Sequence, residues 1–398
     1  MHSGRTTWCY ILAGNPGEGV MAGPTTPTEQ GLPTPARAVL VVALIYIFLV
    51  GVSMLESGIK VMGADTQASL FESVNNPIAG LFVGILGTVL VQSSSASTSV
   101  VVGLVASGAL GVDAAVPMIM GANIGTTVTN TLVSLGSIRQ SDEFKRAFAA
   151  ATVHDFFNLL AVLILLPIEL ATGVLSSIAE SITEALGGSA GSEWKSPIKQ
   201  WVKEPVGWSK DLLGDLGLEE NFLGTAMVLL GLLVVLAALT FITRNMKQLV
   251  ADRVERSLNA VLGSGGGAVA MLVGLIVTIA VQSSSITTSI MVPLAAAGVV
   301  TLRNIFPVTL GANVGTTITA LLAALASGSV DALTIALVHT TFNVTGIVIL
   351  YPMPRIRAIP LRAAERMADL AVERHTMAVA YVITLFIVIP LIGVAVFR

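Results

Sequence analysis

Long apolar runs alternate with short polar clusters along the chain beyond its first 36 residues. Six of the runs approach the roughly 20 residues with which a helix crosses a bilayer. They lie at residues 39–54, 147–167, 223–241, 305–326, 333–351 and 377–396. Composition agrees with this pattern, because 11% of the residues are charged against roughly 25% in soluble domains. The pattern therefore predicts an all-α polytopic membrane protein.

Two motifs each occur twice along the chain, and the same offset separates the copies of both. Gln-Ser-Ser-Ser stands at residues 92–95 and 282–285, and Gly-Ala-Asn-x-Gly-Thr-Thr stands at 121–127 and 311–317. An internal repeat of this order indicates a duplication. We therefore expect a disordered N-terminal tail, a first transmembrane repeat, an extracellular inter-repeat loop, a second transmembrane repeat and an additional transmembrane helix, at residues 1–36, 38–186, 187–218, 219–372 and 375–398.

Each Gln-Ser-Ser-Ser motif interrupts an apolar run that is long enough for two short helices. Residues 77–92 and 96–110 flank the first motif, and residues 267–282 and 286–300 flank the second. A helix of about 15 residues is about 23 Å long, which is short for a hydrocarbon core of roughly 30 Å. Irregular backbone at that depth must line a cavity or be buried in protein. Each motif therefore predicts the tip of a re-entrant helical hairpin.

Positive charges gather on one side of the membrane when each hairpin is counted as re-entrant and each other run as one crossing. They are Arg139, Lys145, Arg146, Arg244, Lys247, Arg253, Arg256, Arg355, Arg357, Arg362, Arg366 and Arg374. The positive-inside rule makes that side cytoplasmic. The first hairpin then enters from outside and the second from inside, so the two repeats have inverted topology. Inverted repeats with broken helices are typical of secondary transporters, in which the two tips would meet near the midplane.

The hairpin tips carry groups that suit an anion. Serine hydroxyls and glutamine amides both donate hydrogen bonds, and the returning half-helix exposes its first backbone N–H groups at its positive end. The alternative is structural, because serine and threonine often join helices in membranes. We predict a substrate site of Gln92, Ser93, Ser94, Ser95, Gln282, Ser283, Ser284 and Ser285.

The second motif suits a hard cation. Its glycines permit unwinding, and its asparagine and threonine oxygens can coordinate sodium, although small-residue packing of helices is the alternative. A buried anion needs positive charge, which a bound sodium ion, or less favourably a proton, supplies in spanning segments almost without Lys or Arg. The predicted sodium ligands are Ser95, Asn123, Thr126, Thr127, Ser285, Asn313, Thr316 and Thr317.

A second set of polar residues lies inside apolar runs and could support the site. His154 and Asn158 recur as His339 and Asn343 at a slightly shorter offset, and Asp155 has no acidic counterpart in the second copy. Intramembrane ionisable residues are candidates for function, and a satisfied structural cluster is the alternative. Nucleic acid is an unsuitable partner for a chain of net charge −3. The sequence also carries no recognisable nucleophile–base set, so we predict that the protein is not an enzyme.

The paired motifs, together with the stretches at residues 151–158 and 165–169, resemble the type II sodium-dependent phosphate cotransporters. The resemblance covers residues 40–350 and is strongest for a bacterial-type member, since residues 187–221 are short and contain no cysteine. It implies inorganic phosphate as substrate and sodium as the coupling ion, with the two Gln-Ser-Ser-Ser stretches as the binding core.

We therefore predict a sodium-coupled symporter of inorganic phosphate in the cell membrane that works by alternating access. A sodium-coupled carboxylate carrier and a passive anion channel are the alternatives. The first would be expected to add an arginine for a second carboxylate. The lipid bilayer is a further partner, and the oligomeric state stays open, with a dimer as one option.

Overall fold

The computed structural model describes residues 32–62, 76–186, 196–215, 217–264 and 266–397, and the side chains of residues 250–264 are outside the description. Its elements are α-helices with one 3₁₀ turn and one π-helical turn. In the first half they are α1 (Thr34–Val61), α3 (Pro77–Val91), α4 (Ser94–Ser107), α5 (Val112–Gly125), α6 (Val128–Ser134), η2 (Leu135–Ser137), α7 (Ser141–Thr172) and α8 (Val174–Ala185). In the second half they are α9 (Pro197–Gly214), α10 (Glu220–Ser264), α11 (Gly267–Val281), α12 (Ser284–Ala296), α13 (Leu302–Ser327), α14 (Val330–Leu350), α15 (Pro354–Glu373), α16 (His375–Ile383), η3 (Thr384–Val388) and α17 (Ile389–Phe397).

Within the described part of the chain, six helical stretches are long and apolar enough to cross a membrane. They are Thr34–Val61, Ser141–Thr172, Glu220–Leu249, Leu302–Ser327, Val330–Leu350 and His375–Phe397. Each covers one of the six apolar runs, the run at 333–351 up to residue 350, so the prediction of an all-α membrane protein is confirmed. The four helices that flank the two Gln-Ser-Ser-Ser motifs, α3, α4, α11 and α12, are apolar but shorter.

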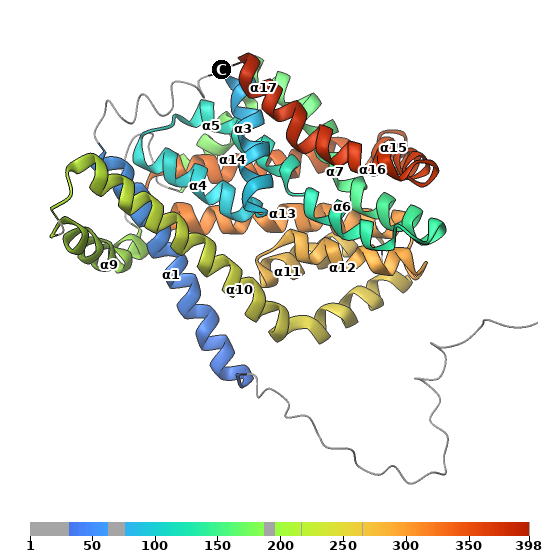
Figure 1. The fold of residues 1–398 in the computed structure, drawn as a ribbon, viewed down its shortest axis with the longest axis horizontal. Helices are drawn as coiled ribbons and strands as arrows, with labels where there is room; N and C mark the ends of the chain where they lie inside the picture. The colour runs from blue at the N-terminus through green and yellow to red at the C-terminus, as the bar shows by residue number, and fades with distance from the viewer. Residues whose placement is uncertain (1–31, 63–75, 187–195, 216, 265, 398) are drawn as a thin grey trace, which may run out of the picture.

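Helix α13 crosses the middle of the molecule (Figure 1). In this view α3, α4 and α5 lie above it, α11 and α12 lie below it, and α1 and α10 cross at the lower left. The helices α1 and α10 run antiparallel in close contact, since a Cβ added to Gly58 would lie 2.8 Å from the Gly224 carbonyl oxygen. Small residues allow such close approach where apolar surface alone gives little driving force between helices.

The packing of each hairpin on the following helix recurs in the second copy. Helix α3 packs on α5, and α11 packs on α13. In each pair, two glycines bring one backbone against the other, because a Cβ added to any of them would collide with a carbonyl oxygen. The glycine and carbonyl pairs are Gly84 with Met118, Gly121 with Leu81, Gly274 with Val308, and Gly311 with Met271. The two pairs of the second copy follow those of the first at the same offset as the motifs.

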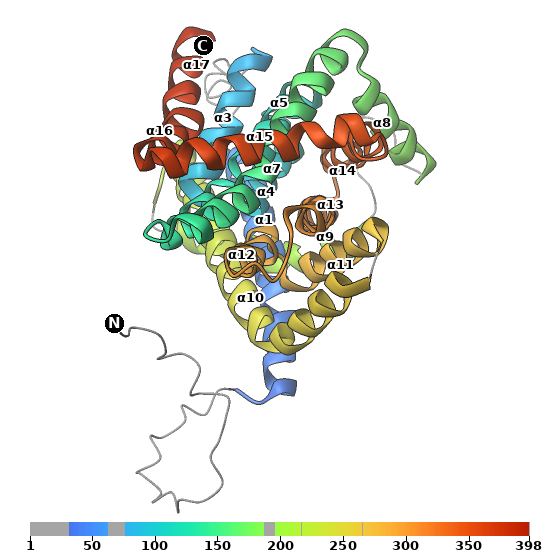
Figure 2. The same cartoon turned by 90° about the vertical axis from the view of Figure 1, so that its right-hand side faces the viewer.

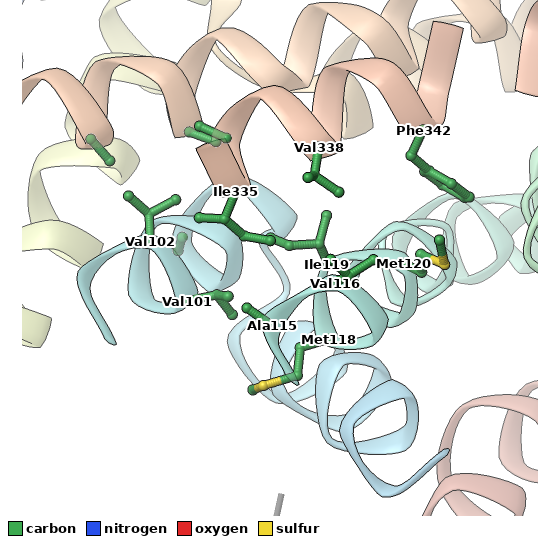
Figure 3. Close-up of a cluster of buried hydrophobic side chains, with 14 of the residues drawn as sticks. Val101, Val102, Ala115, Val116, Met118, Ile119, Met120, Ile335, Val338 and Phe342 are labelled. Carbon is green, nitrogen blue, oxygen red and sulfur yellow. The ribbon is translucent and has the colours of Figure 1, made fainter. Parts of the chain in front are cut away.

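Apolar side chains fill the space between the two copies where α4 and α5 meet α14 (Figure 3). Val101 and Val102 of α4 and Ile119 of α5 come from the first copy, and Ile335 and Val338 of α14 come from the second. All five are buried, with at most 4% of their surface exposed. Their dispersion contacts are individually weak but numerous, so they fix how α4, α5 and α14 lie against each other.

Helix boundaries correct the expected hairpins in detail. The predicted halves at 77–92, 96–110, 267–282 and 286–300 become α3, α4, α11 and α12, and the non-helical break shrinks from three residues to two. Ser94 and Ser284 already belong to the returning helices. The physical reason is that the preceding serine caps each returning helix, which lets the helix begin earlier.

The expected broken helix is present in one copy only. In the first copy a turn at residues 126–127 separates α5 from α6, and Thr126 keeps right-handed helical angles. In the second copy α13 continues unbroken through residues 311–317. The hydroxyls of Thr316 and Thr317 donate to carbonyls of their own helix, which is compatible with a continuous helix. The glycines of the motif serve close packing here, as the alternative interpretation held.

Two other expected boundaries need correction. Helix α1 begins at Thr34, inside the tail expected at residues 1–36, of which residues 1–31 lie outside the described part of the chain. The expected inter-repeat loop at 187–218 contains the helix α9, whose Val202 and Val206 are buried. Helices α8, α9 and α15 are amphipathic. Helix α15 lies across one end of the molecule, where α13 is seen nearly end-on (Figure 2).

Candidate functional site

Gln92 and Gln282 adopt the same unusual conformation at the two tips, which are the short breaks between α3 and α4 and between α11 and α12. Each ends its helix with φ of 56°, and they are the two non-glycine residues with positive φ in the described part of the chain. Left-handed angles cost a residue with a Cβ roughly 1–2 kcal/mol. A matching strain at equivalent positions indicates that the surrounding contacts hold both glutamines in place.

The glutamine side chains make equivalent contacts in the two copies. The amide nitrogen of Gln92 donates to the Val89 carbonyl over 2.6 Å, and that of Gln282 donates to the Ile279 carbonyl over 2.7 Å. Their amide oxygens accept from threonine hydroxyls that stand two residues after each Gly-Ala-Asn-x-Gly-Thr-Thr motif, Thr129 of α6 at 3.1 Å and Thr319 of α13 at 3.0 Å. Each glutamine therefore fastens its tip to the helical segment just beyond the motif.

Ser93 and Ser283 act as N-caps of the returning helices α4 and α12. Their hydroxyl oxygens accept from the backbone nitrogens of Ala96 at 3.2 Å and Ile286 at 3.4 Å. This capping places Ser94, Ser95, Ser284 and Ser285 in the first helical turn, where backbone N–H groups lack helical partners. Both tips consequently present hydroxyls at the positive end of a helix.

Ser284 has a buried hydroxyl without a hydrogen-bond partner among the described residues. Its side chain is buried in the second tip, with 2% of the residue exposed. Leaving a buried polar group unsatisfied costs about 1–3 kcal/mol, so such a group in a native structure calls for an explanation. Ser97 and Thr88 of the first hairpin have buried, unpartnered hydroxyls as well. A polar ligand at the start of α12 would satisfy the Ser284 hydroxyl.

The returning half of each hairpin packs on the other copy. Helix α4 lies against α13 and α14, and α12 lies against α6 and α7. Polar contacts join α12 to α6, because the Asn130 amide nitrogen donates to the Thr288 hydroxyl over 2.7 Å and its oxygen accepts from Ser289 over 2.8 Å. Ser285 also donates weakly to the Thr126 carbonyl, at 3.5 Å. Direct contact between the two Gln-Ser-Ser-Ser tips stays a prediction.

A buried network of asparagines joins the second motif to the candidate supporting residues. The Asn313 amide nitrogen donates to the oxygens of Asn158 and Asn343, at 3.0 and 3.1 Å. In turn, Asn158 donates to the Asn123 carbonyl at 2.8 Å, and Asn343 donates to the Asn313 carbonyl at 3.2 Å. His339 lies 3.3 Å from the Asn123 amide oxygen. The structure thus brings Asn123, Asn313, Asn158, Asn343 and His339 together.

His154 lies at the position equivalent to His339, yet both of its ring nitrogens are buried without a partner among the described residues. The asparagine amides, by contrast, largely satisfy one another. The Nδ1 of His339 is buried without a described partner as well, so both histidines keep unused hydrogen-bonding capacity.

Asp155 is fully buried and lies where three helices meet. Its Oδ2 accepts a hydrogen bond of 2.8 Å from Tyr381 of α16, while its Oδ1 has no partner among the described residues. Thr127 and Thr131 lie beside the same carboxylate. A carboxylate surrounded by hydroxyls offers several hard oxygen ligands to a cation. Burying an acid in the membrane costs free energy, so such a residue is a candidate for function.

The four threonines of the second motif are buried but directed toward their own helices. Thr126 and Thr316 donate to the carbonyls of Ala122 and Ala312 over 3.0 and 3.1 Å. Thr127 donates to Ile124 in the same way, and Thr317 to Val314. Their oxygen lone pairs remain available to a cation. Within the described residues there is no group of three His, Cys, Asp or Glu side chains that could hold a metal.

Sequence reasoning overlooked several residues that the structure ties to the tips. Thr129 and Thr319 obey the offset of the two motifs, so the repeat itself could have revealed them. Asn130 stands three residues after the first Gly-Ala-Asn motif, and it was missed because its equivalent is Ala320. Tyr381 gave no repeat signal, because the last helix follows the second copy.

Comparison with known proteins gives a consistent result. A model of the family described as Na+/Pi-cotransporter matches the chain twice, at residues 47–184 and 223–359. Sodium-dependent phosphate transport protein 2B of Homo sapiens is 34% identical over 444 residues, which cover 89% of this chain and 64% of that protein. Sodium-dependent phosphate transport protein 2A of Ovis aries is 34% identical over 423 residues, which cover 88% of this chain and 66% of that protein. The chain thus spans less than two thirds of these relatives' length, and no solved structure matches it.

Proposed function

Because the chain belongs to the Na+/Pi-cotransporter family, we propose that it is a sodium-coupled symporter of inorganic phosphate in the cell membrane. Its relatives are named for sodium-dependent phosphate transport. The observation that carries the proposal is the second tip, where the buried Ser284 hydroxyl has no described partner at the start of α12. A tetrahedral oxyanion offers the acceptors that this hydroxyl and the first N–H groups of the helix require.

The substrate site comprises Gln92, Ser93, Ser94, Ser95, Gln282, Ser283, Ser284 and Ser285. Within it the residues have different tasks. The glutamines and Ser93 and Ser283 are already engaged in holding the tips, so they position the site. The serines of the first helical turn, above all Ser284, contact phosphate. Helix ends supply partial positive charge, but a phosphate anion needs more.

Sodium supplies the remaining charge. Asp155 offers an unpartnered carboxylate oxygen beside Thr127 and Thr131, which makes it the strongest cation ligand of the candidate set. The further ligands that we propose are Ser95, Asn123, Thr126, Ser285, Asn313, Thr316 and Thr317. Because phosphate and sodium compensate each other's charge in a medium of low polarity, neither ion is expected to bind well alone.

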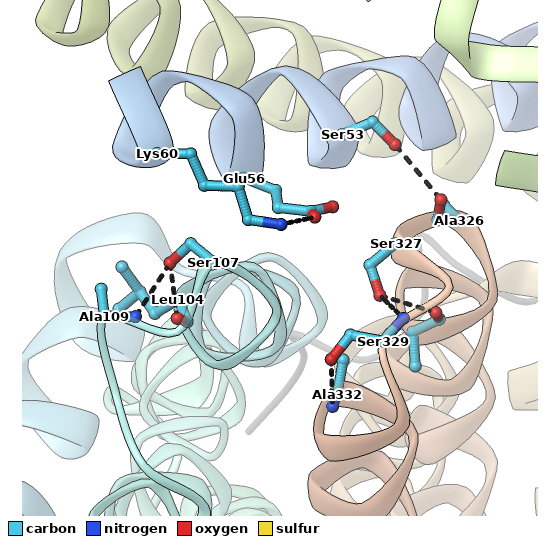
Figure 4. A network of polar contacts seen from close by, with 11 residues as sticks. Ser53, Glu56, Lys60, Leu104, Ser107, Ala109, Ala326, Ser327, Ser329 and Ala332 are labelled. Atoms are coloured by element: carbon cyan, nitrogen blue, oxygen red, sulfur yellow. Dashed lines mark hydrogen bonds and ion pairs between the residues drawn. The ribbon is translucent and has the colours of Figure 1, made fainter. Parts of the chain in front are cut away.

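We also propose that the two copies are inverted repeats with re-entrant hairpins. At one end of the molecule, Figure 4 shows Ser107, at the end of α4, in the same region as Glu56 of α1 and Ser327 of α13, the two helices on which α4 packs. At the other end, Arg146 of α7 donates to the Ala295 and Ala296 carbonyls at the end of α12. These positions support hairpins that open toward opposite ends, and the positive-inside rule assigns the first to the outside and the second to the inside.

Alternating access follows from how the hairpins pack. Each returning helix rests on the other copy, so movement of one copy against the other exposes a tip to one side at a time. The polar contact between Asn130 and α12 has no equivalent in the other hairpin, because the matching residue is Ala320. The second hairpin is therefore bound to the opposite copy more strongly than the first.

Phosphate uptake into proteoliposomes tests the function. We expect labelled phosphate to accumulate only when sodium is higher outside the vesicles, and arsenate, but not succinate, to compete. Ser284→Ala should abolish uptake while the protein stays folded, whereas Ser181→Ala, on the exposed face of α8, should transport normally. Competition by succinate would favour a carboxylate carrier, and current without sodium would favour an anion channel. Either result would refute the proposal.

A further inference from the structure

A cavity of 410 Å³ lies at the end of the molecule that α15 covers, away from the hairpin tips. It is lined from α11, α13, α14's end and α15, and three of its lining residues are Arg303, Arg357 and Arg362. Its size falls within the roughly 300–1,000 Å³ typical of small-ligand pockets. The proposed transport site uses none of these residues.

No acidic side chain among the described residues balances the positive charge of the three arginines in this cavity. Among the described side chains, its lining contains no acidic residue, and none of the three arginines forms an ion pair. Arg357 stacks over the Tyr351 ring at 5.0 Å, which orients its guanidinium without neutralising it. The remaining polar groups of the lining, the Tyr351 hydroxyl and the Asn304 amide, can both donate hydrogen bonds.

Three helices also begin at the cavity. Gly267 starts α11, Arg303 and Asn304 lie in the first turn of α13, and Pro354 starts α15. All three helices lack an acidic residue in the first turn and a capping side chain. Helix N-termini favour negative charge, so the arginine of α13 stands at the least favourable end of its helix. An anion bound in the cavity would be attracted both to the arginine and to the positive end of the helix, and would offset their mutual repulsion.

We propose that this cavity is a second anion site, separate from the transport site, that binds a phosphate group. Guanidinium groups match the oxygens of phosphate in bidentate pairs, and three of them exceed what one carboxylate with two oxygens can use. The phosphate group comes from an anionic phospholipid or from inorganic phosphate. Basic pockets between membrane helices bind phospholipid headgroups in other proteins.

Lipid and phosphate binding to the purified full-length protein in detergent distinguishes the sources. Native mass spectrometry measures bound phosphatidylglycerol against phosphatidylcholine, and thermal denaturation in sodium-free buffer measures stabilisation by inorganic phosphate. The test variant combines Arg303→Gln, Arg357→Gln and Arg362→Gln. The control combines Arg355→Gln, Arg366→Gln and Arg374→Gln, which remove the same number of charges from residues that do not line the cavity.

We expect the test variant, but not the control, to lose affinity by about tenfold or more for one of the two probes. Selective loss of phosphatidylglycerol binding identifies a lipid headgroup, and selective loss of the phosphate effect identifies the free ion. Equal binding by wild type, test variant and control would overturn the proposal. If the triple variant fails to fold, Arg303→Gln with Arg362→Gln keeps the stacked Arg357 and gives the same decision.

Discussion

At the scale of single residues, the tips combine strain with unused hydrogen-bonding capacity. Two glutamines adopt left-handed angles, and one serine hydroxyl is buried without a described partner. Features of this kind reduce stability and persist where the surroundings or a ligand compensate for them. They therefore separate residues that serve the ligand from residues that serve the fold.

Replacing Gln92 tests this separation. Gln92→Gly relieves the left-handed strain but removes the hydrogen bond from Thr129, so we expect stability close to that of the wild type. Gln92→Ala keeps the strain and should be about 1 kcal/mol less stable than the glycine variant. Both should lose most phosphate uptake, because the tip is no longer fastened. Thermal denaturation and uptake measure the two effects, and normal uptake by Gln92→Gly would show that the amide has no role in transport.

Much of this site could be predicted from residue types, and the remainder depended on packing. The serines were found because four polar residues interrupt an apolar run twice at one offset. The left-handed angle of Gln92 was not predictable, since it depends on Thr129 from another helix. Asp155 was recognised as an intramembrane acid, but its partner Tyr381 lies far along the chain without a repeat to indicate it.

At the scale of elements, glycines decide how the hairpins pack. Gly84 and Gly274 lie where a Cβ would collide with a backbone carbonyl, whereas Gly87, one turn further along α3, has open space. The sequence indicated flexible glycines that let a helix unwind, yet α13 is continuous across its motif. A pattern of Gly and Thr cannot distinguish unwinding from close packing, because both need small residues.

Alanine substitutions along α3 provide a matched pair. Gly84→Ala places a methyl group against the Met118 carbonyl, so α3 must move away from α5, and we expect a loss of about 1–3 kcal/mol in stability. Gly87→Ala should be neutral or stabilise by up to about 1 kcal/mol, because alanine favours the helix. Thermal denaturation in detergent measures both. Equal melting temperatures would contradict the packing role of Gly84.

At the scale of the whole molecule, the inverted arrangement predicts which residues face each side. Cys9 is the sole cysteine, so Cys9→Ser gives a clean background for labelling. Asn76→Cys and Gly111→Cys flank the first hairpin and should react with a membrane-impermeant maleimide on intact cells. Gly266→Cys and Thr301→Cys flank the second and should react only after permeabilisation. Labelling of both pairs from the same side would contradict the inversion.

Because Asn130 binds only the second hairpin, its removal should change the equilibrium between the states that bury and expose the second tip. Asn130 makes two hydrogen bonds to α12, of 2.7 and 2.8 Å, and each contributes about 0.5–1.5 kcal/mol. Asn130→Ala should therefore free the second tip and shift the equilibrium roughly 5–150-fold, the range that about 1–3 kcal/mol implies.

In Cys9→Ser protein, a maleimide applied from the inside should label Ser285→Cys faster when Asn130→Ala is present. Thr98→Ala, whose hydroxyl bonds within its own helix, should leave the rate unchanged. An unchanged rate with Asn130→Ala would mean that these two hydrogen bonds do not hold the second tip against the first copy.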